Sequence, residues 1–566
     1  MMSVNVERVW HFPANAADDN VRALSQTLQL PRSLALHLIK AGFSDIDKAT
    51  AFLRPKLQEL SNPFLLPNLA EAVDRIFKAI DRKERIVLYG DYDVDGVSSI
   101  ALLTRVLRCY GAEPTQFLPH RVDEGYGLSV DAVNRCLQLV RPELFVALDC
   151  GTTSLEQIAA LQAGGTDVIV VDHHEPKPVL PECCALINPK IGTSFHYLCT
   201  VGLVFKLCHG LLKQRRLPEV DLKDYLDLIA VGTIADLAPL VEENRILVSH
   251  GLNRLASSRW IGLRALLRRS GIEGPVKATE VAFRLGPRLN AAGRLGVAQE
   301  ALDLLLTENA SEADRLAESL DAQNRERQAV EQATIDEALA LLANQFDPHS
   351  AAIVVGSPGW HPGVVGIVAS RLMRQFHRPT IVIGFDEEGN GKGSGRSIPG
   401  FSLVRALETC DGLLTQFGGH AMAAGVTLRF DQLASFTKMF LATAQESLSV
   451  DLLTPKYVID AEVSGRELNF EFLVGYERLQ PFGVGNPAPL FCLRGAEPGA
   501  EPRLLKEKHR VFSIRHDGKL LRAIQFGSGD IPVPPPPWDI AFFLEINRFQ
   551  DRLELQLHIE AIRSSH

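Results

Sequence analysis

Short apolar runs alternate with amphipathic segments between residues 68 and 250. The apolar runs are RIVLYG at 85–90, LFVAL at 144–148 and DVIVV at 167–171. The flanking segments with helical spacing are 71–82, 97–111 and 154–165. Strands that lack a polar face must be covered on both sides, and helices between consecutive strands allow parallel pairing. The pattern therefore predicts an α/β domain built on a parallel sheet.

A different pattern begins at residue 310. Residues 310–345 contain neither Pro nor Gly and are rich in Ala, Glu, Leu, Gln and Arg. They predict one helix of roughly 50 Å, and its many charges favour a bridge between domains over a core helix. Two further apolar runs, at 351–357 and 379–385, predict a second α/β region. From residue 452 the segments are short and alternating, which predicts a small antiparallel β-barrel.

The chain has 566 residues, which is too many for a single hydrophobic core. We therefore expect five parts. They are an N-terminal helical segment (1–60), a catalytic α/β domain (61–255), a connecting region with the long helix (256–345), a second α/β domain (346–450) and a C-terminal barrel (451–566).

The composition is typical of a folded protein, with 46% hydrophobic and 22% charged residues. No apolar run is long enough to cross a bilayer, and the first residues show no secretion signal. The nine cysteines include no CxxC pair, so we expect reduced thiols in a cytoplasmic protein without a membrane partner. A net charge of −9 argues mildly against a nucleic-acid binder, but it is compatible with a local basic groove.

Acidic and imidazole side chains follow every apolar run of the predicted parallel sheet. In chain order they are Asp91, Asp93 and Asp95 after the first run, Asp149 after the second, and Asp172, His173 and His174 after the third. Because the carboxyl ends of parallel strands share one edge of a sheet, these groups are expected to meet in one crevice. Like charges beside a buried strand repel one another, and a bound cation would offset that repulsion.

A fourth acidic position is Asp236, in the segment GTIADLAPL that follows another apolar run. Carboxylates with an imidazole suit Mn²⁺ or Mg²⁺ better than a zinc site built on thiolates. The set is large enough for two ions, which together form a clamp for displacement at phosphorus. A lone DxD segment is often only a turn or helix cap, and a lone His-His pair is usually not a ligand pair. Their occurrence at successive strand ends favours the metal site.

Four segments resemble the motifs of the DHH phosphoesterase superfamily: DYDVDG at 91–96, ALDCG at 147–151, VDHHE at 171–175 and GTIADLAPL at 232–240. The resemblance implies that the metal ligands are Asp93, Asp95, Asp149, His173 and Asp236, with Asp149 bridging the two ions. It also implies that Asp172 orients a neighbouring imidazole and that His174 faces the scissile phosphate. This chain has Tyr89 where many members have histidine and Asp91 where others have asparagine. Asp91 is therefore either a ligand or a base near the ligands.

The second α/β region holds a glycine-rich segment, Gly418, Gly419 and His420, that resembles the GGH signature of the substrate-binding partner domain in this superfamily. Glycines let a backbone approach a phosphate closely, although a Gly-Gly pair alone is often only a turn. Upstream, Arg396 lies in an expected loop with Ser394 and Ser397, where its guanidinium could bind a phosphate in a fork.

The segment 284–296, RLGPRLNAAGRLG, places three polar residues among small ones: Arg288, Asn290 and Arg294. Two interpretations remain open for this segment. It is either a tight surface loop or a phosphate-backbone contact inside the cleft between the two α/β domains.

From about residue 20 to the end, the chain resembles the single-stranded-DNA exonucleases of the superfamily, and the segment PFGVGNPAP (481–489) with the barrel after it carries this likeness. The resemblance implies an enzyme that digests single-stranded DNA from 5′ to 3′ into 5′-mononucleotides with two Mn²⁺ or Mg²⁺ ions. It further implies work in DNA repair and recombination beside a single-strand binding protein and a helicase.

The barrel would bind a single strand through basic and aromatic side chains. The candidates are Arg510, Phe512, Arg515, Lys519, Arg522, Phe549 and Arg552. The alternative for each aromatic is a place in the barrel core. Alternative functions are a DHH phosphodiesterase that acts on short oligonucleotides or cyclic dinucleotides, and an inert scaffold that binds single strands.

Overall fold

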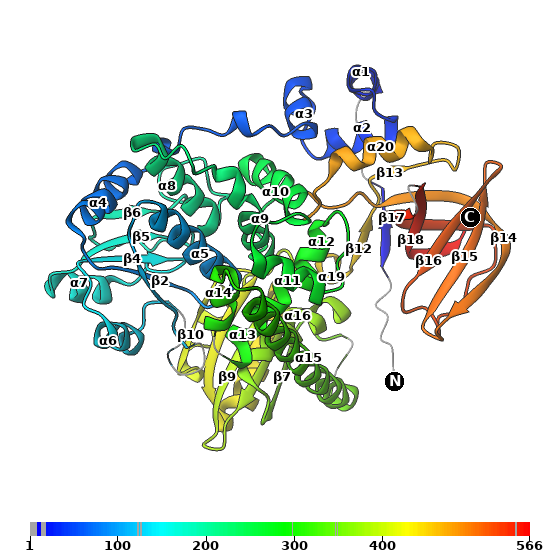
Figure 1. Ribbon diagram of the computed structural model, residues 1–566. Helices are drawn as coiled ribbons and strands as arrows, with labels where there is room; N and C mark the ends of the chain where they lie inside the picture. The colour runs from blue at the N-terminus through cyan, green and yellow to red at the C-terminus, as the bar shows by residue number, and fades with distance from the viewer. Residues whose placement is uncertain are drawn as a thin grey trace. The chain divides into compact units, whose positions relative to one another are not determined.

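The computed structural model describes residues 8–12, 18–120, 124, 127–296, 298–345, 347, 349–549 and 552–565. These residues form two compact units, each of which is described by itself (Figure 1). The first unit contains Ser61–Ala238 and His250–Pro455. The second contains Arg8–Leu60, Pro239–Ser249 and the chain from Lys456 onward.

The first unit begins with a five-stranded parallel sheet in the order β3-β2-β4-β5-β6. The strands are β2 (Ile86–Gly90), β3 (Thr115–Phe117), β4 (Leu144–Leu148), β5 (Asp167–Val171) and β6 (Ala185–Ile187). One face packs on α6 (Val130–Leu139) and α7 (Leu155–Ala163). The helices α4 (Leu69–Arg82), α5 (Val94–Cys109) and α8 (Thr200–Gln214) lie on the other face (Figure 1). The predicted parallel sheet, covered on both faces, is confirmed.

A run of helices follows this sheet in the chain. It comprises α9 (Leu226–Ala235), α10 (Glu242–Leu255), α11 (Ile261–Arg269), α12 (Ala278–Glu280), the π-helical turn η4 (Val281–Leu285), α13 (Gly286–Leu295) and α14 (Gln299–Leu306). Of the two interpretations of 284–296, the tight surface loop is wrong, because residues 284–295 are helical. Pro287 is compatible with a helix there, because it lies in the first turn of α13, where no N–H is needed.

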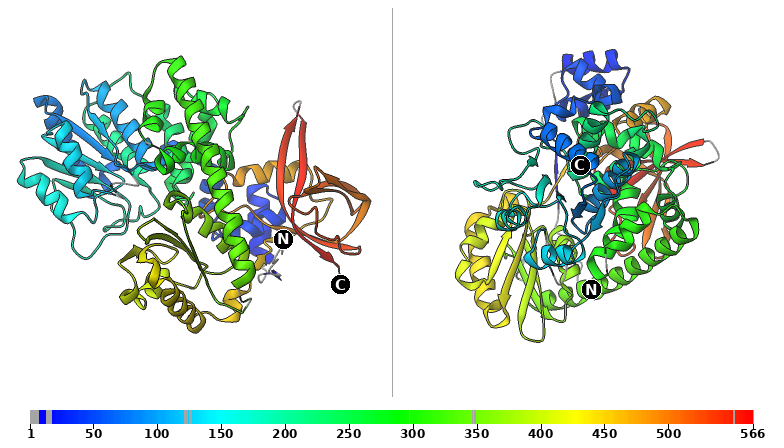
Figure 2. Two further views of the ribbon diagram at one scale, coloured as in Figure 1. Left: turned by 90° about the horizontal axis from the view of Figure 1, so that it is seen from below. Right: turned by 60° about the vertical axis from the view of Figure 1, so that its left-hand side comes forward.

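The predicted long helix is confirmed as α15, Ala310–Gln345. It packs against α11, α13 and α14 and also against α16 (Pro362–Phe376) and β7 (Ile353–Pro358), so it bridges the two α/β parts of the first unit (Figures 1 and 2). Polar side chains along one side of α15 are nevertheless buried. They are Asp321, Asn324, Arg327, Glu331 and Thr334.

The second sheet of the first unit has the order β10-β11-β9-β8-β7. Its further strands are β8 (Thr380–Phe385), β9 (Asn390–Arg396), β10 (Gln416–Gly419) and β11 (Ala423–Arg429). Helix α16 packs against β8 and β9, whereas α17 (Leu403–Glu408) and α18 (Leu433–Ser447) contribute to the core on the opposite face. The short helix α19 (Val450–Leu453) follows. Ser394 and Arg396 lie on β9, so the expected loop around Arg396 is wrong.

The second unit joins N-terminal elements to the C-terminal barrel. The N-terminal elements are β1 (Val9–His11), α1 (Asp18–Leu28), α2 (Arg32–Lys40) and α3 (Ile46–Leu53). Strand β1, which the sequence did not predict, pairs in parallel with β12 (Lys456–Val458). Strand β13 (Ala461–Glu462) and helix α20 (Phe470–Leu479) precede the barrel.

Five strands close the barrel: β14 (Phe491–Leu505), β15 (His509–His516), β16 (Lys519–Gln525), β17 (Trp538–Phe549) and β18 (Arg552–Ser564). The predicted barrel is confirmed, but it is not wholly antiparallel, because β16 and β18 pair in parallel. Phe512 lies in its core and is excluded as a surface contact. The side chains of Phe549 and Arg552 lie outside the described residues. Among the helices that the structure describes, none has the length and apolarity needed to cross a membrane.

Candidate metal centre and substrate cavity

The three acidic clusters meet at the carboxyl edge of the parallel sheet, as predicted. Strands β2, β4 and β5 end at Gly90, Leu148 and Val171, which are neighbours in the sheet register. The next residue in each case is an aspartate, namely Asp91, Asp149 or Asp172. All three aspartates are buried. Asp149 adopts a left-handed backbone with φ 65°, a conformation that costs energy for most residues and that, apart from glycine, is tolerated best by Asn and Asp.

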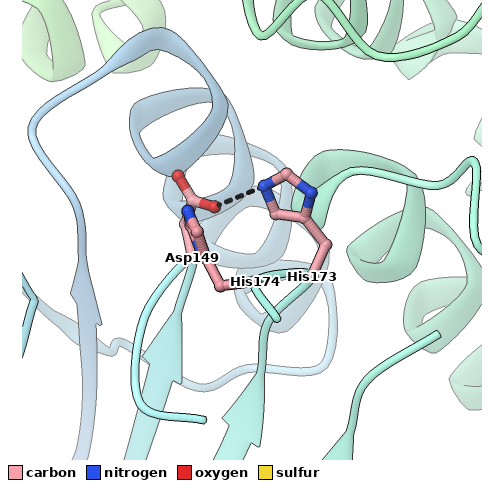
Figure 3. A group of neighbouring side chains, drawn as sticks. All are labelled: Asp149, His173 and His174. Carbon is pink, nitrogen blue, oxygen red and sulfur yellow. Dashed lines mark ion pairs between the residues drawn. The ribbon is translucent and has the colours of Figure 1, made fainter. Parts of the chain in front are cut away.

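His173 lies among three carboxylates from three separate segments. Its Nε2 is 3.4 Å from Asp149 Oδ1, 3.8 Å from Asp95 Oδ2 and 3.8 Å from Asp236 Oδ2 (Figure 3 shows the Asp149 contact). Three overlapping groups of side chains have the geometry to hold a metal ion. They are Asp149 with His173 and His174, Asp95 with His173 and Asp236, and Asp149 with Asp91 and Asp93. Asp149 and His173 each belong to two of the groups.

The ionisation of these groups reflects burial in a crowded acidic site. Burial and the neighbouring aspartates raise the pKa of Asp149 and of Asp236 well above the usual carboxyl range. Burial and the charge of Asp93 raise the pKa of Asp95 to about 7. Burial and the charge of His174 lower the pKa of His173 to about 3, which leaves a neutral imidazole suited to bind a cation. The donor set therefore fits hard divalent ions.

Asp95 is fixed by the N-terminus of α8. The backbone N–H groups of Thr200 and Val201 donate to its two carboxylate oxygens, each at 2.7 Å. The positive end of a helix favours a negative charge, so this contact holds the carboxylate in place. The hydroxyl of Thr200 also donates to Asp149 Oδ1 at 2.9 Å. Thr200 was not predicted, since no local pattern relates it to the acidic segments.

The loop between β2 and α5 is held by its own caps and by α13. Asp93 is the N-cap of α5 and accepts from the N–H groups of Asp95 and Gly96, at 2.9 and 3.2 Å. A Cβ on Gly96 would lie 2.4 Å from the carbonyl oxygen of Asp91, so this turn requires glycine. From α13, Asn290 Oδ1 accepts from the N–H of Val94 at 3.2 Å.

His174 is oriented by Asp172. Its Nδ1 lies 2.6 Å from Asp172 Oδ1, and the N–H of Thr152 donates to the other oxygen at 2.9 Å. Burial alone would raise the pKa of Asp172, but these hydrogen bonds hold it below the ordinary value. Burial acts to lower the pKa of His174, but the bond to Asp172 and its charge outweigh burial and raise it. The pair therefore favours the protonated form of the His174 imidazole at the edge of the site.

Tyr89, where the sequence departs from the motif it resembles, lies on β2 (Ile86–Gly90), two residues before Asp91. Its hydroxyl donates to the carbonyl oxygen of Gly127 at 2.9 Å, and its ring stacks on Phe117 within the core under α6 and α7. Tyr89 is therefore a core residue, and its neighbour in the acidic loop, Asp91, supplies an additional buried carboxylate.

A cavity of about 430 Å³ lies against the second sheet and reaches the acidic loop at Tyr92. Its lining includes the start of α16, Ser394 on β9 and Gly418 on β10. Arg396 Nη1 donates to Ser394 Oγ at 2.7 Å, so the two residues expected to bind phosphate lie together. Lys392, Gln416 and Thr427 also line the cavity and were not predicted. The alternation of GKGSGR (391–396), with polar residues between glycines, was the available signal for a strand with one polar face.

The other candidate residues of the second domain, Gly419 and His420, directly follow Gly418 in the chain. Gly419 has φ 135° and a Cβ there would lie 2.5 Å from the carbonyl oxygen of Ala423, so its role in the turn is steric. His420 is exposed. A hydrogen bond from Lys190 is the main cause that lowers the pKa of Glu175, and the charge of His420 contributes. This electrostatic interaction shows that the GGH segment (418–420) lies near Glu175, the last residue of the VDHHE segment (171–175).

The three residues predicted on α13 have different surroundings. Asn290 faces the acidic loop, as described above. Arg294 Nη1 donates to the carbonyl oxygen of Gly363 at the start of α16, at 3.0 Å. Arg288 is ion-paired with Asp321 of α15 at 2.9 Å and donates to the carbonyl oxygen of Arg284. Arg288 therefore has internal partners and is not brought to the acidic cluster.

Family models match three stretches of the chain. The N-terminal domain of the DHH family matches residues 85–233, and the DHHA1 domain matches residues 349–446. The parallel sheet with its acidic edge and the second sheet thus define a phosphoesterase of the DHH class. The RecJ OB domain matches residues 459–561, which form the barrel.

Relatives of known identity narrow this class. The single-stranded-DNA-specific exonuclease RecJ of Bacillus subtilis is 37% identical over 551 residues, which cover 96% of this chain and 69% of that protein. RecJ of Escherichia coli is 35% identical, with 96% of this chain and 98% of that protein covered. The crystal structure of Thermus thermophilus RecJ with Mn²⁺ matches with a TM-score of 0.85 and 33% identity, over 99% of this chain and 80% of that one. A Mg²⁺ complex matches with a TM-score of 0.79 and 32% identity, over 99% of this chain and 79% of that one. The chain belongs to the RecJ family of single-stranded-DNA-specific exonucleases.

Proposed function

We propose that this enzyme removes 5′-mononucleotides from the 5′ end of single-stranded DNA by metal-dependent hydrolysis. The observation that carries the proposal is the position of His173 Nε2, within 3.4–3.8 Å of carboxylates from three separate segments. Such a buried acidic cluster is unfavourable without cations, and membership of the RecJ family supplies the substrate class.

We propose that the cluster holds two divalent ions, Mn²⁺ or Mg²⁺. The ligands would be Asp93, Asp95, Asp149, His173 and Asp236, with Asp149 shared. When bound, such ions polarise phosphate oxygens and make water more acidic. Contacts within the protein support this arrangement, because the backbone N–H groups of Thr200 and Val201 bind Asp95 and the side chain of Asn290 binds the N–H of Val94.

His174 and Asp172 would act on the phosphate that is cleaved. Asp172 accepts a hydrogen bond from Nδ1 of His174, and we expect Nε2 of this imidazole to donate to an anionic oxygen of the phosphate. A charge fixed at the place where negative charge develops lowers the barrier without reorganisation at the moment of reaction. Asp91, also buried in this loop, would either bind an ion or accept a proton.

The terminal nucleotide would be bound by the second domain, through Ser394, Arg396, Gly418, Gly419 and His420, with its phosphate at Ser394 and Arg396. Arg396 supplies a planar donor fork beside a hydroxyl, which suits a phosphate monoester. Arg294 is our candidate for the next backbone phosphate. Arg288 and Asn290, which have the partners described above, would position α13 beneath the bound DNA strand.

The test is the product profile of an end-labelled single strand. We expect mononucleotides released from the 5′ end, no digestion with excess chelator, and no digestion by Asp93→Ala although that variant still binds the strand. Release of internal fragments, or undiminished digestion in chelator, would contradict the proposal. A phosphodiesterase of short oligonucleotides is not favoured, since this chain carries the RecJ-type barrel.

We further propose a cytoplasmic enzyme of DNA repair and recombination that works beside a single-strand binding protein and a helicase. Its nine free thiols and its substrate class suit a reducing compartment that contains DNA. The proposed boundaries of its parts are those expected from the sequence, and the matched ranges 85–233, 349–446 and 459–561 support three of them. Co-purification of either partner with the tagged full chain, tested with nuclease added, would check the association.

A further inference from the structure

The cavity beside Tyr92 has a floor made of main chain. Directly paired strand residues share one face of a sheet, and here Gly418 pairs with Gly425, which pairs with Ser394. Phe417 and Val426 also line the cavity, although their side chains pack in the core on the opposite face. Only their backbone atoms can therefore face the cavity. Helix α16 packs against β8 and β9 on this face, and Gly418 and Gly425 on the outer strands β10 and β11 are exposed.

Neither glycine of the floor is needed for the fold. A Cβ on Gly418 or on Gly425 would meet no atom within 4 Å, and neither residue has a positive φ. Gly419, the next residue, has a positive φ of 135°, and a Cβ there would lie 2.5 Å from the carbonyl oxygen of Ala423. Glycine weakens a strand interior, and it often marks a place where a ligand approaches the backbone closely. The two bare positions are thus a cost to the sheet that the fold does not explain.

Polar side chains stand on both sides of this floor. On one side, Lys392, Thr427 and Gln416 are paired in a row across β9, β11 and β10. On the other side, Ser394 and Arg396 lie next to each other, and α16 packs against them at Gly366. Tyr92, between Asp91 and Asp93 of the acidic loop, lines the end of the cavity toward the metal centre. A volume of about 430 Å³ suits one small organic group with a few polar contacts.

We propose that this cavity takes the nucleobase of the terminal nucleotide, which lies flat on the backbone of Gly418 and Gly425. This inference rests on the proposed function, since it assumes that the terminal phosphate binds at Ser394 and Arg396. A planar base can contact a side-chain-free surface over its whole face, and a contact with the face of a base is tolerant of sequence. The row of Lys392, Thr427 and Gln416 then limits the slot to a single base and contacts its edge.

The test uses Gly425→Val in the full-length chain and short 5′-phosphorylated single strands whose first nucleotide either carries a base or is abasic. Binding is measured in chelator by fluorescence anisotropy, so that no cleavage occurs. Valine favours a strand and finds open space here, so the unfolding temperature should be unchanged or raised. We expect Gly425→Val to weaken binding of the normal strand about tenfold and to change binding of the abasic strand less than about twofold.

Two controls separate the possible outcomes. Gly412→Ala, at another glycine with open space outside the cavity, should leave both affinities unchanged. A strand that is abasic at its 3′ end should behave like the normal strand. Equal weakening of the normal and 5′-abasic strands, or no weakening of either, would overturn the proposal. If the parent binds the strands with this pattern but never digests them with metal present, the proposed function fails and the base site stands.

Discussion

Asn290 of α13 and Val94 at the start of α5 are joined by a hydrogen bond of 3.2 Å, although 196 residues separate them in the chain. The bond fixes the loop that carries Asp91, Asp93 and Asp95. Next to it, a Cβ on Gly293 would lie 2.7 Å from the carbonyl oxygen of Tyr92, so α13 and the acidic loop are in close contact. Helix α13 is therefore a support for the metal centre.

The first prediction concerns this support. Replacing Asn290 with alanine removes a bond of the kind that caps a helix, so we expect the affinity for Mn²⁺ to fall roughly fivefold to tenfold. Isothermal titration measures this affinity. Arg284→Ala is the matched control, because Arg284 bonds to Ser270 and Gly271 and does not touch the acidic loop. Equal losses in both variants would show that only general stability of the helix matters.

The second prediction is that Asp149→Asn makes the metal-free protein more stable. Burial and neighbouring charges raise the pKa of Asp149, so its ionised form is unfavourable there. Asparagine tolerates the left-handed backbone and still accepts from Thr200, and we expect a gain of about 1 kcal/mol or more in the free energy of unfolding. Chemical denaturation in chelator measures this gain. Added Mn²⁺ should stabilise the parent much more than the variant.

Asp149→Ala is the matched comparison for that experiment. It removes the same charge but loses the bond from Thr200 and places alanine at φ 65°, so it should not show the gain. A variant Asp149→Asn that is less stable than the parent in chelator would contradict the account of charge repulsion.

The third prediction is a pH dependence of the metal-free protein. The pKa of Asp95 is raised to about 7, so the folded state binds a proton more tightly than the unfolded state does. The pKa of His174 is also raised, which acts in the same direction. The free energy of unfolding should therefore fall as the pH rises from about 6.5 to about 8. Denaturation across this range in chelator tests the sign, and a stability that rises with pH would contradict it.

The lower limit of that range is set by His173. Its pKa is lowered to about 3, so its contribution to stability is lost as the pH falls below the ordinary histidine value of about 6.5. Below about pH 6.5, the loss of stability caused by His173 therefore opposes the gain caused by the raised pKa of Asp95. Saturating Mn²⁺ should reduce the dependence above it, because ions would compete with protons for the same carboxylates.

The fourth prediction concerns the terminal phosphate. Arg396→Ala should reduce the preference for 5′-phosphorylated over 5′-hydroxyl strands about tenfold, because a charged fork of donors is lost. Competition binding with the two kinds of strand measures this preference. Arg405→Ala, an exposed arginine on α17, serves as the control. A uniform loss of affinity for both strands would remove Arg396 from the terminal site.

The fifth prediction concerns the barrel. Arg515 and Arg522 are exposed, and the pairing of Ser513 with Arg522 puts both arginines on the outer face of β15 and β16. If each arginine binds one phosphate, replacing both with alanine should make the negative slope of log affinity against log salt shallower by about 1.4, at about 0.7 per phosphate. Binding of a long single strand at several salt concentrations measures the slope. An unchanged slope would place the strand elsewhere on the barrel.

The sequence predicted those parts of the site that depend on local patterns of apolar and polar residues. Asp91, Asp149 and Asp172 could be placed at one edge, because they follow apolar strands of a parallel sheet. The strand β9 was missed because its glycines hide the alternation of Lys392, Ser394 and Arg396. The bonds from Thr200 to Asp149 and from Asn290 to Val94 join distant segments, and such contacts depend on tertiary packing that no local pattern records.

The two bonds that hold Asp95 come from backbone N–H groups at the start of α8, so they belong to the fold itself. A backbone donor at a helix end keeps its place as long as the helix is folded, so this carboxylate offers the same orientation to either ion. Exchange between magnesium and manganese would then be governed by how readily each ion sheds its own water, which magnesium does reluctantly. We expect the two ions to differ more in their rate of entry than in the shape of the site that receives them.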